Sequence, residues 1–215
     1  MLTSTICANA NIKLSGSWRY KMTISIETPE GTKTGTSIRQ IAYGTDLPLI
    51  PSVGARTYGL SRGEAVIVDL GKRGTLFALL QNVYGGVGYS YRVALQSFPD
   101  KEATPIGTKV VLPTTRYPKL VRFKEITNPA TVESILEPAN KCCEIGINHL
   151  EDFFGKGVRI KEISIEITND EVTTDIKKKL PWLSSIKCEK NDCVKIRNPF
   201  PSKSGLTFTD FVKGQ

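Results

Sequence analysis

The sequence predicts an α+β fold, mainly antiparallel β sheet built from hairpins, with two or three short helices in the C-terminal half. Three observations carry this prediction: strict alternation of apolar and polar residues over 18–27, two apolar runs joined by a glycine turn within 64–80, and helix-start signals after residue 128. The 215 residues are 40% hydrophobic and 23% charged, which excludes a disordered or fibrous protein. We expect a flexible N-terminus over 1–17 and one domain over 18–215, whose basic tail is irregular from about residue 184.

The first expected element is a hairpin. Over 18–27 the apolar residues share one face, as a strand with one buried side requires; they are Trp18, Tyr20, Met22, Ile24 and Ile26. Residues 28–31 read Thr-Pro-Glu-Gly, a favourable turn sequence. A second strand is expected over 34–43, through Thr36, Ile38 and Ile41, and it should pair antiparallel with the first.

A second hairpin is expected further along. Residues 44–61 are rich in proline, glycine and serine and predict a loop. The runs 64–70 and 75–80 are largely apolar and flank the turn Gly71-Lys72-Arg73-Gly74, so both faces of this hairpin should be buried. The turn joins strand to strand, whereas a phosphate-binding loop needs a helix N-terminus, so we interpret it as a plain turn.

The middle of the chain predicts one more strand. Residues 85–88 are a glycine-rich connector, and 89–96 alternate with Tyr89, Tyr91, Val93 and Leu95 on one face. Residues 98–108 form a turn-rich link. This link is the one plausible internal boundary, and its shortness favours a single domain.

Helices are expected in the second half. Asn128 and Pro129 form a good helix start, and that helix should end before Pro138. A short helix should follow Asn148 in a capping-box sequence, end at Gly155 and direct its two phenylalanines inward.

One more strand and one more helix are expected after residue 155. Ile163, Ile165 and Ile167 alternate as a half-buried strand, whereas Val158 and Ile160 have the opposite parity. We therefore predict a bulge near residues 161–162 that restores the phase. A short basic helix should occupy 173–180.

The five cysteines favour an oxidising compartment. The N-terminal Ala8-Asn9-Ala10 has the small-x-small form of a leader-cleavage site, so Cys7 is interpreted as part of a trimmed leader. An even set then remains, and bonds from the adjacent pair to the later two are the easier geometry. The candidates for structural disulfides are Cys142, Cys143, Cys188 and Cys193.

His149, the single histidine, allows two other interpretations. One is a metal site shared with the cysteines, although zinc sites more often show Cys-x2-Cys pairs. The other is a base for Cys142 or Cys143, but no sequence feature supports that pairing. We favour a structural residue in the first turn of a short helix, and we assign no catalytic residue, metal or cofactor.

Positive charge is concentrated near the C-terminus. The net charge is +8, and residues 177–203 hold eight basic against two acidic residues. Such a cluster is either a solvated surface or a site for nucleic acid or acidic lipid. The speculative anion-binding residues are Lys177, Lys178, Lys179, Lys187, Lys190, Lys195 and Arg197.

Several blocks of sequence follow one another in a fairly specific order, namely 18–31, 62–71, 76–80, 117–123, 154–158, 165–168 and 179–183. These blocks resemble a family of uncharacterised proteins from Gram-negative bacteria. The resemblance runs from about residue 18 to 183, and the segment 140–148 looks like an insertion relative to it. Members look exported or lipid-anchored, which implies a periplasmic or secreted protein, attached to the membrane only through a missing leader. Ile6 is unsuited to the position before a lipidated cysteine, which puts anchoring through Cys7 in doubt.

The sequence therefore predicts a non-enzymatic binding or structural module of the bacterial envelope, whose partner is another envelope protein or an anionic surface. No run is long enough to span a membrane. One alternative is a hydrolase that uses the dispersed carboxylates Glu64, Asp69 and Glu166. Another is a binder of nucleic acid or acidic lipid through the basic C-terminal region.

Overall fold

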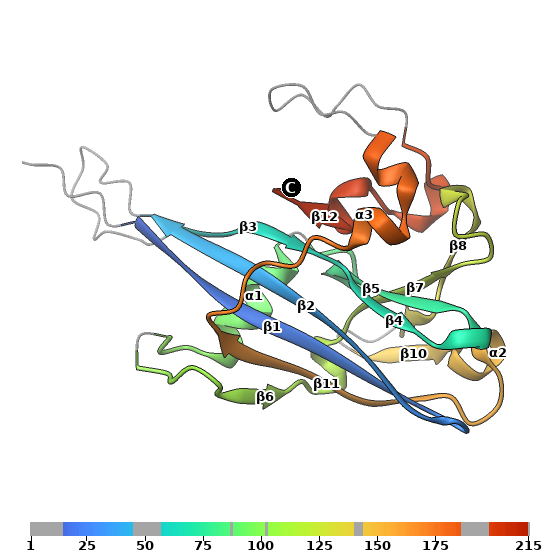
Figure 1. Cartoon of the computed structure of the whole chain (residues 1–215), viewed down its shortest axis with the longest axis horizontal. Coiled ribbons are helices and arrows are strands. Elements are labelled where there is room, and N and C mark those ends of the chain that lie inside the picture. The colour runs from blue at the N-terminus through green and yellow to red at the C-terminus, as the bar shows by residue number, and fades with distance from the viewer. Residues whose placement is uncertain are drawn as a thin grey trace, which may run out of the picture.

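The structure is a computed structural model that describes residues 15–44, 57–86, 88–101, 103–139, 144–185 and 198–214. Three antiparallel sheets dominate it, and short helices, turns and irregular segments connect their strands (Figure 1). This confirms the predicted α+β fold of hairpins. Cys7, Cys142, Cys143, Cys188 and Cys193 lie outside the described residues, as do Lys187, Lys190, Lys195 and Arg197.

The largest sheet has six strands and is centred on one long hairpin. In spatial order its strands are β12 (Val212–Lys213), β3 (Thr57–Glu64), β2 (Gly31–Gly44), β1 (Ser15–Thr28), β11 (Arg159–Thr168) and β6 (Lys109–Val111). The predicted hairpin is confirmed, since β1 and β2 pair from Thr28 opposite Gly31 to Ser15 opposite Gly44. The alternation in β1 also holds, because its five alternating apolar side chains are all buried.

Strand β2 directs an unexpected set of side chains inward. Thr36 is exposed and Ile38 is half-buried, whereas Ser37, Arg39 and Ile41 are fully buried. Ile41, and not Ile38, therefore lies on the inward face of β2. Arg39 is two residues before Ile41, so its side chain enters the core as well. Charged side chains are rarely fully buried, which is why the sequence did not predict this.

The predicted bulge is present in β11. Ser25 of β1 lies opposite Glu162 and Ile26 lies opposite Ile160, so Lys161 is the extra residue. The inserted residue changes the parity of the strand at this point. Ile160 therefore packs against the same core as Ile163 and Ile165.

The second sheet has four strands and contains the predicted glycine-turn hairpin. Its order is β4 (Val66–Asp69), β5 (Thr75–Asn82), β7 (Pro118–Phe123) and β8 (Val132–Ser134), and the turn between the first two is a 3-10 segment, η1 (Gly71–Arg73). Six consecutive residues of β5 are buried, which confirms that both faces of this strand are covered.

Two hydrophobic cores lie on opposite faces of β5. Leu76, Ala78 and Leu80 belong to the main core with β1, β4 and β11, and Phe77 and Leu79 belong to a second core. The second core is closed by C-terminal residues from α3 (Ile176–Lys179), η4 (Pro181–Ser185) and the segment 198–214, which includes η5 (Ser202–Ser204) and η6 (Phe208–Asp210).

Two predictions in the N-terminal half are wrong. Residues 57–61, predicted as loop, belong to β3, which pairs with β2. Residues 89–96, predicted as a strand, form the helix α1 (Tyr89–Ser97). Tyr89 and Val93 are buried one helical turn apart, so a spacing of four residues produced the apparent alternation.

The helix predicted to begin after Asn128 ends after one turn. The Asn128 side chain does accept the backbone N–H of Ala130, but η3 (Pro129–Thr131) leads directly into β8. Ile135 then donates its N–H to Leu120 across the sheet, so pairing with β7 replaces helical bonding. A two-stranded sheet follows, made of β9 (Leu136–Pro138) and β10 (Ile145–Asn148).

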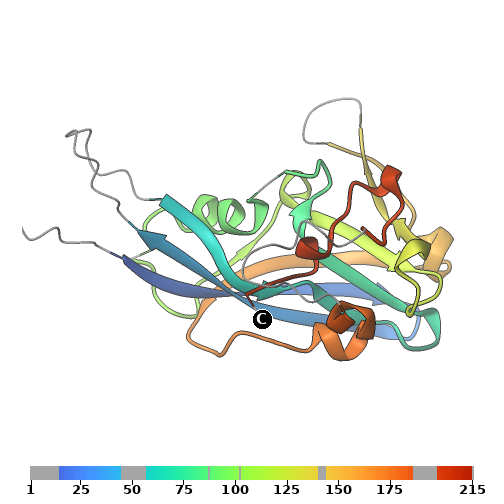
Figure 2. The same ribbon diagram turned by 90° about the horizontal axis from the view of Figure 1, so that it is seen from above.

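The later short helices occur where the sequence predicts them. α2 (Leu150–Phe154) ends at Gly155, and its Phe154 is buried. α3 follows residues 169–175, which cross the outer side of the β1–β2 hairpin (Figure 1). Seen from above, this crossing segment and α1 lie on opposite sides of that hairpin (Figure 2). The crossing is fixed to β2 because Thr173 accepts the N–H of Ile38.

Candidate functional site

The candidate site is a pocket of about 550 Å³ beside the β9–β10 hairpin. Its walls come from η2 (Thr114–Arg116), the residue before β7, both strands of the hairpin and the first two residues of β11. The lining residues are Thr114, Thr115, Tyr117, Leu136, Glu144, Ile145, Asn148, Arg159 and Ile160. A volume of this size suits a small organic ligand.

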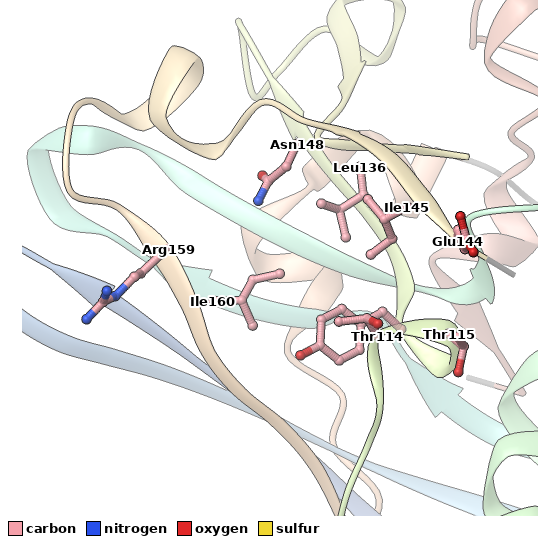
Figure 3. Close-up of a pocket in the computed structure, with 9 residues that line it drawn as sticks. Thr114, Thr115, Leu136, Glu144, Ile145, Asn148, Arg159 and Ile160 are labelled. Carbon is pink, nitrogen blue, oxygen red and sulfur yellow. The ribbon is translucent and has the colours of Figure 1, made fainter. Parts of the chain in front are cut away.

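The floor of the pocket is apolar. Figure 3 shows the side chains of Leu136, Ile145 and Ile160 directed toward one another. Leu136 belongs to the main core, and the other two are partly buried against it. A ligand on this floor would therefore contact side chains that the fold already holds in place.

Polar groups that have no partner in the described part of the chain surround this floor. Asn148 uses its carbonyl oxygen to accept the N–H of Leu150 at 3.0 Å, which leaves its amide N–H groups unused within the described residues. Among the residues that the structure describes, the hydroxyl groups of Thr114, Thr115 and Tyr117 have no hydrogen-bond partner either. Burial, reinforced by the negative charge of Glu162, raises the pKa of Tyr117, so this hydroxyl stays neutral.

The charges at the rim differ in their availability. Arg159 donates from Nε to Glu27 at 2.8 Å, and in Figure 3 its guanidinium points away from the floor. Within the described residues, the carboxylate of Glu144 has no ion-pair partner, and it lies at the opposite end of the pocket (Figure 3). Among the described residues, the lining therefore offers one unpaired acceptor, Glu144, and one cation, Arg159, which is paired with Glu27.

Hydrogen bonds at both ends hold the hairpin wall in place. Ala139 donates its N–H to the carbonyl of Glu144 at 2.9 Å, and Tyr84 donates its hydroxyl to the same carbonyl. At the other end, His149 donates its backbone N–H to Ile135 at 2.9 Å. The pocket is thus a preformed feature of the fold.

His149 lies just outside the pocket, immediately before α2. Its Nδ1 lies 2.8 Å from a carboxylate oxygen of Asp152 and its Nε2 lies 4.0 Å from one of Glu137, while its ring stacks on Phe153. Within the described residues, no three side chains of histidine, cysteine, aspartate or glutamate are arranged to hold a metal ion. The proposed sulfur ligands and disulfides fall outside those residues.

The three candidate catalytic carboxylates do not line the pocket, and each makes its own contacts elsewhere in the fold. Glu64 is buried and accepts the N–H groups of Asp175 and Ile176, both at 3.0 Å, so it caps α3. Asp69 accepts from Gly71 and from Lys179, and Glu166 pairs with Lys21 at 3.2 Å. Each of these side chains has a structural role in the fold.

The described part of the basic cluster is largely paired. Lys178 contacts Asp175 at 2.7 Å and Lys179 contacts Asp69 at 3.0 Å, while Lys177 is half-buried. The nearby aromatic residues Trp182 and Phe200 belong to the second core, where their rings lie 5.5 Å apart. These two rings are therefore not available to stack on nucleic-acid bases.

Sequence reasoning did not identify the pocket residues as a group. They come from three separate stretches, within 114–117, 136–148 and 159–160, which meet only through strand pairing. Asn148 belongs to the predicted capping-box sequence and does cap Leu150, but its place in the pocket lining has no local signal.

Comparisons with protein-family models, with curated proteins and with solved structures found no match for this chain. Among the described residues, no helix has both the length and the apolar character needed to cross a membrane.

Proposed function

We propose that the protein is a non-enzymatic binding module that holds a small organic ligand in the pocket beside the β9–β10 hairpin. The observation that carries the proposal is the ring of unused hydrogen-bonding groups around an apolar floor. Ligand sites typically combine these two features, because the floor supplies binding energy and the polar groups fix orientation.

Binding is favoured over catalysis by the roles of the charged groups. A general acid–base site needs two titratable side chains within reach of the same reacting atom. Glu144 is the one carboxylate among the pocket's lining residues, and Arg159 is engaged by Glu27. Glu64, Asp69 and Glu166 are each used to hold the fold together.

We also propose that the module works in the bacterial envelope, in the periplasm or outside the cell. The support is the resemblance of its sequence to exported Gram-negative proteins and the even set of four later cysteines. Fractionation of cells that carry the native gene, followed by a count of free thiols, tests this location. Recovery in the cytosol with every thiol free would contradict it.

Ligand-observed NMR with a library of fragment-sized molecules tests the binding function. Ile145→Arg would place a long charged side chain across the floor, and Ile106→Arg is the matched control because Ile106 is 62% exposed and does not line the pocket. We expect fragments to bind the native protein and the control but not Ile145→Arg. Absence of any binding to the native protein at millimolar concentration would rule out the proposed function.

A further inference from the structure

We propose that the ligand of this pocket is a neutral saccharide unit, an inference that rests on the binding function proposed above. The polar groups of the lining that have no partner within the described residues indicate which class of molecule can bind there. Those groups are three hydroxyls, one amide N–H pair and one carboxylate.

The charges in the pocket disfavour an anionic ligand. Arg159 is the one cation among the lining residues, and Glu27 holds its guanidinium at 2.8 Å. Among the described residues, the unpaired charge in the lining is the carboxylate of Glu144, which would repel a phosphate or a fatty-acid headgroup. A neutral ligand meets neither obstacle.

The polar groups also disfavour a purely apolar ligand. An alkyl chain would cover the floor but would displace water from the side chains of Thr114, Tyr117 and Asn148 without replacing its hydrogen bonds. Thr114 and Asn148 are exposed and Tyr117 is half-buried, so each of these groups that such a ligand covered without pairing would lose its hydrogen bonds to water, at about 1–3 kcal/mol per group. The pocket therefore selects a molecule that can hydrogen-bond around its circumference.

A sugar ring meets both requirements. Each hydroxyl of the ring both donates and accepts, so it can accept from the donor-only amide of Asn148 and donate to the acceptor-only carboxylate of Glu144. Its C–H face is apolar and can pack on the ring of Tyr117 and on Ile160. No covalent step is involved, so the ligand is released unchanged.

Chemical-shift mapping on the isotope-labelled protein tests this assignment. The probes are the methyl glycosides of glucose, galactose and mannose, together with N-acetylglucosamine, and the comparison probes are octanoate and inorganic phosphate. We expect at least one sugar to shift the amide signals of residues 114–117, Asn148 and Ile160 with millimolar affinity. Octanoate and phosphate should leave these signals in place.

Two variants that preserve the fold identify the groups responsible. Asn148→Asp retains an oxygen to cap Leu150 but removes the amide donor, and Tyr117→Phe removes only a hydroxyl. Each should weaken sugar binding by about three- to tenfold, as expected for one hydrogen bond. Tyr58→Phe, on β3 and outside the pocket, should leave the affinity unchanged.

The outcomes separate the ligand class from the binding function. Octanoate or a library fragment that binds in the pocket while every sugar fails would overturn the saccharide assignment and leave the binding function intact. Sugar binding that both pocket variants leave unchanged would also overturn it. If no sugar, no octanoate and no library fragment binds, both proposals fail together.

Discussion

Arg39 shows how a single buried side chain completes the hydrogen bonding of a sheet. The ladder between β5 and β7 is irregular between Ala78 and Asn82, and Arg39 lies against this stretch. Arg39 donates to the carbonyls of Ala78 and Leu79 at 3.4 and 3.5 Å, and to that of Glu64 at 3.2 Å. Burial raises the pKa of the nearby Tyr20, so this phenol is neutral and does not supply a counter-charge.

We expect Arg39→Met to lower the free energy of unfolding by about 2–4 kcal/mol. Methionine fills similar space but donates no hydrogen bond. The carbonyl of Glu64 keeps the hydroxyl of Ser37 at 2.8 Å, whereas those of Ala78 and Leu79 lose the Arg39 donor, and a buried carbonyl left without a donor costs about 1–3 kcal/mol. The variant also lacks the desolvation penalty of the buried guanidinium, which offsets part of this loss of stability. Urea unfolding measures the change.

Arg19→Met is the matched control for this substitution. Arg19 lies on β1 opposite Gln40 but on the outer face of the sheet, where it is half-buried. Surface substitutions of this kind usually change stability by about 0.5 kcal/mol or less. Equal stability of the Arg39 and Arg19 variants would mean that the carbonyls find donors elsewhere.

At the scale of the elements, Gly35 determines how closely the two main sheets approach. A Cβ atom at this position of β2 would lie 1.9 Å from the carbonyl oxygen of Ile67 in β4 and 3.0 Å from Val68. Backbone therefore rests on backbone where the long hairpin crosses the smaller sheet. The residues on either side, Thr34 and Thr36, are exposed.

We expect Gly35→Ala to destabilise the protein by about 1–3 kcal/mol or more, because the added methyl group forces the two sheets apart. Gly59→Ala in β3 is the control, since nothing lies within 4 Å of the added atom there. That change should be neutral or slightly stabilising. Thermal unfolding of the two variants compares them directly, and equal melting temperatures would contradict the close contact.

Elements could be predicted where one period persists over many residues. The alternation of β1 and the parity switch of β11 are of this kind, and both were read correctly, including the bulge at Lys161. α1 was misread because Tyr89, Tyr91, Val93 and Leu95 satisfy periods of two and of four together. The helix expected after Asn128 failed because a tertiary partner, Leu120, offered an alternative hydrogen bond.

At the scale of the whole molecule, Arg73 joins three parts of the chain at one end. It donates from Nε and Nη2 to the two carboxylate oxygens of Glu30, in the turn of the long hairpin, at 2.9 and 2.7 Å. It also donates from Nη1 to the carbonyl of Phe154 in α2 at 2.6 Å. The hydrogen bonds from Arg73 lower the pKa of Glu30 from 4.5 to about 2.

We expect this clamp to make stability depend on acid pH. Because the pKa of Glu30 is lower in the folded state, its contribution is fully present above pH 4.5 and is lost as pH falls toward 2. Urea midpoints measured between pH 5 and about pH 2.5 should therefore decline less in Glu30→Gln than in the native protein. Glu125→Gln, at an exposed site outside the clamp, should keep the native decline. An identical decline in both variants would contradict the prediction.

The pocket belongs to this largest scale, and that is why the sequence does not reveal it. Tyr117, Asn148 and Ile160 converge only after β9 pairs with β10 and β11 pairs with β1. Each residue has an ordinary local explanation as a turn, a cap or a strand residue. Local patterns predicted the sheets, whereas the site depends on contacts between distant segments.

The outermost strands of the large sheet, β6 and β12, are three and two residues long, and each contains a lysine, Lys109 or Lys213. A short edge strand that carries a positive charge offers little backbone for a strand of another molecule to pair with. Fibril-like growth by sideways addition of further chains is thereby discouraged, although Ile106 and Val111 are exposed near β6. A concentrated solution of the folded protein should accordingly remain clear.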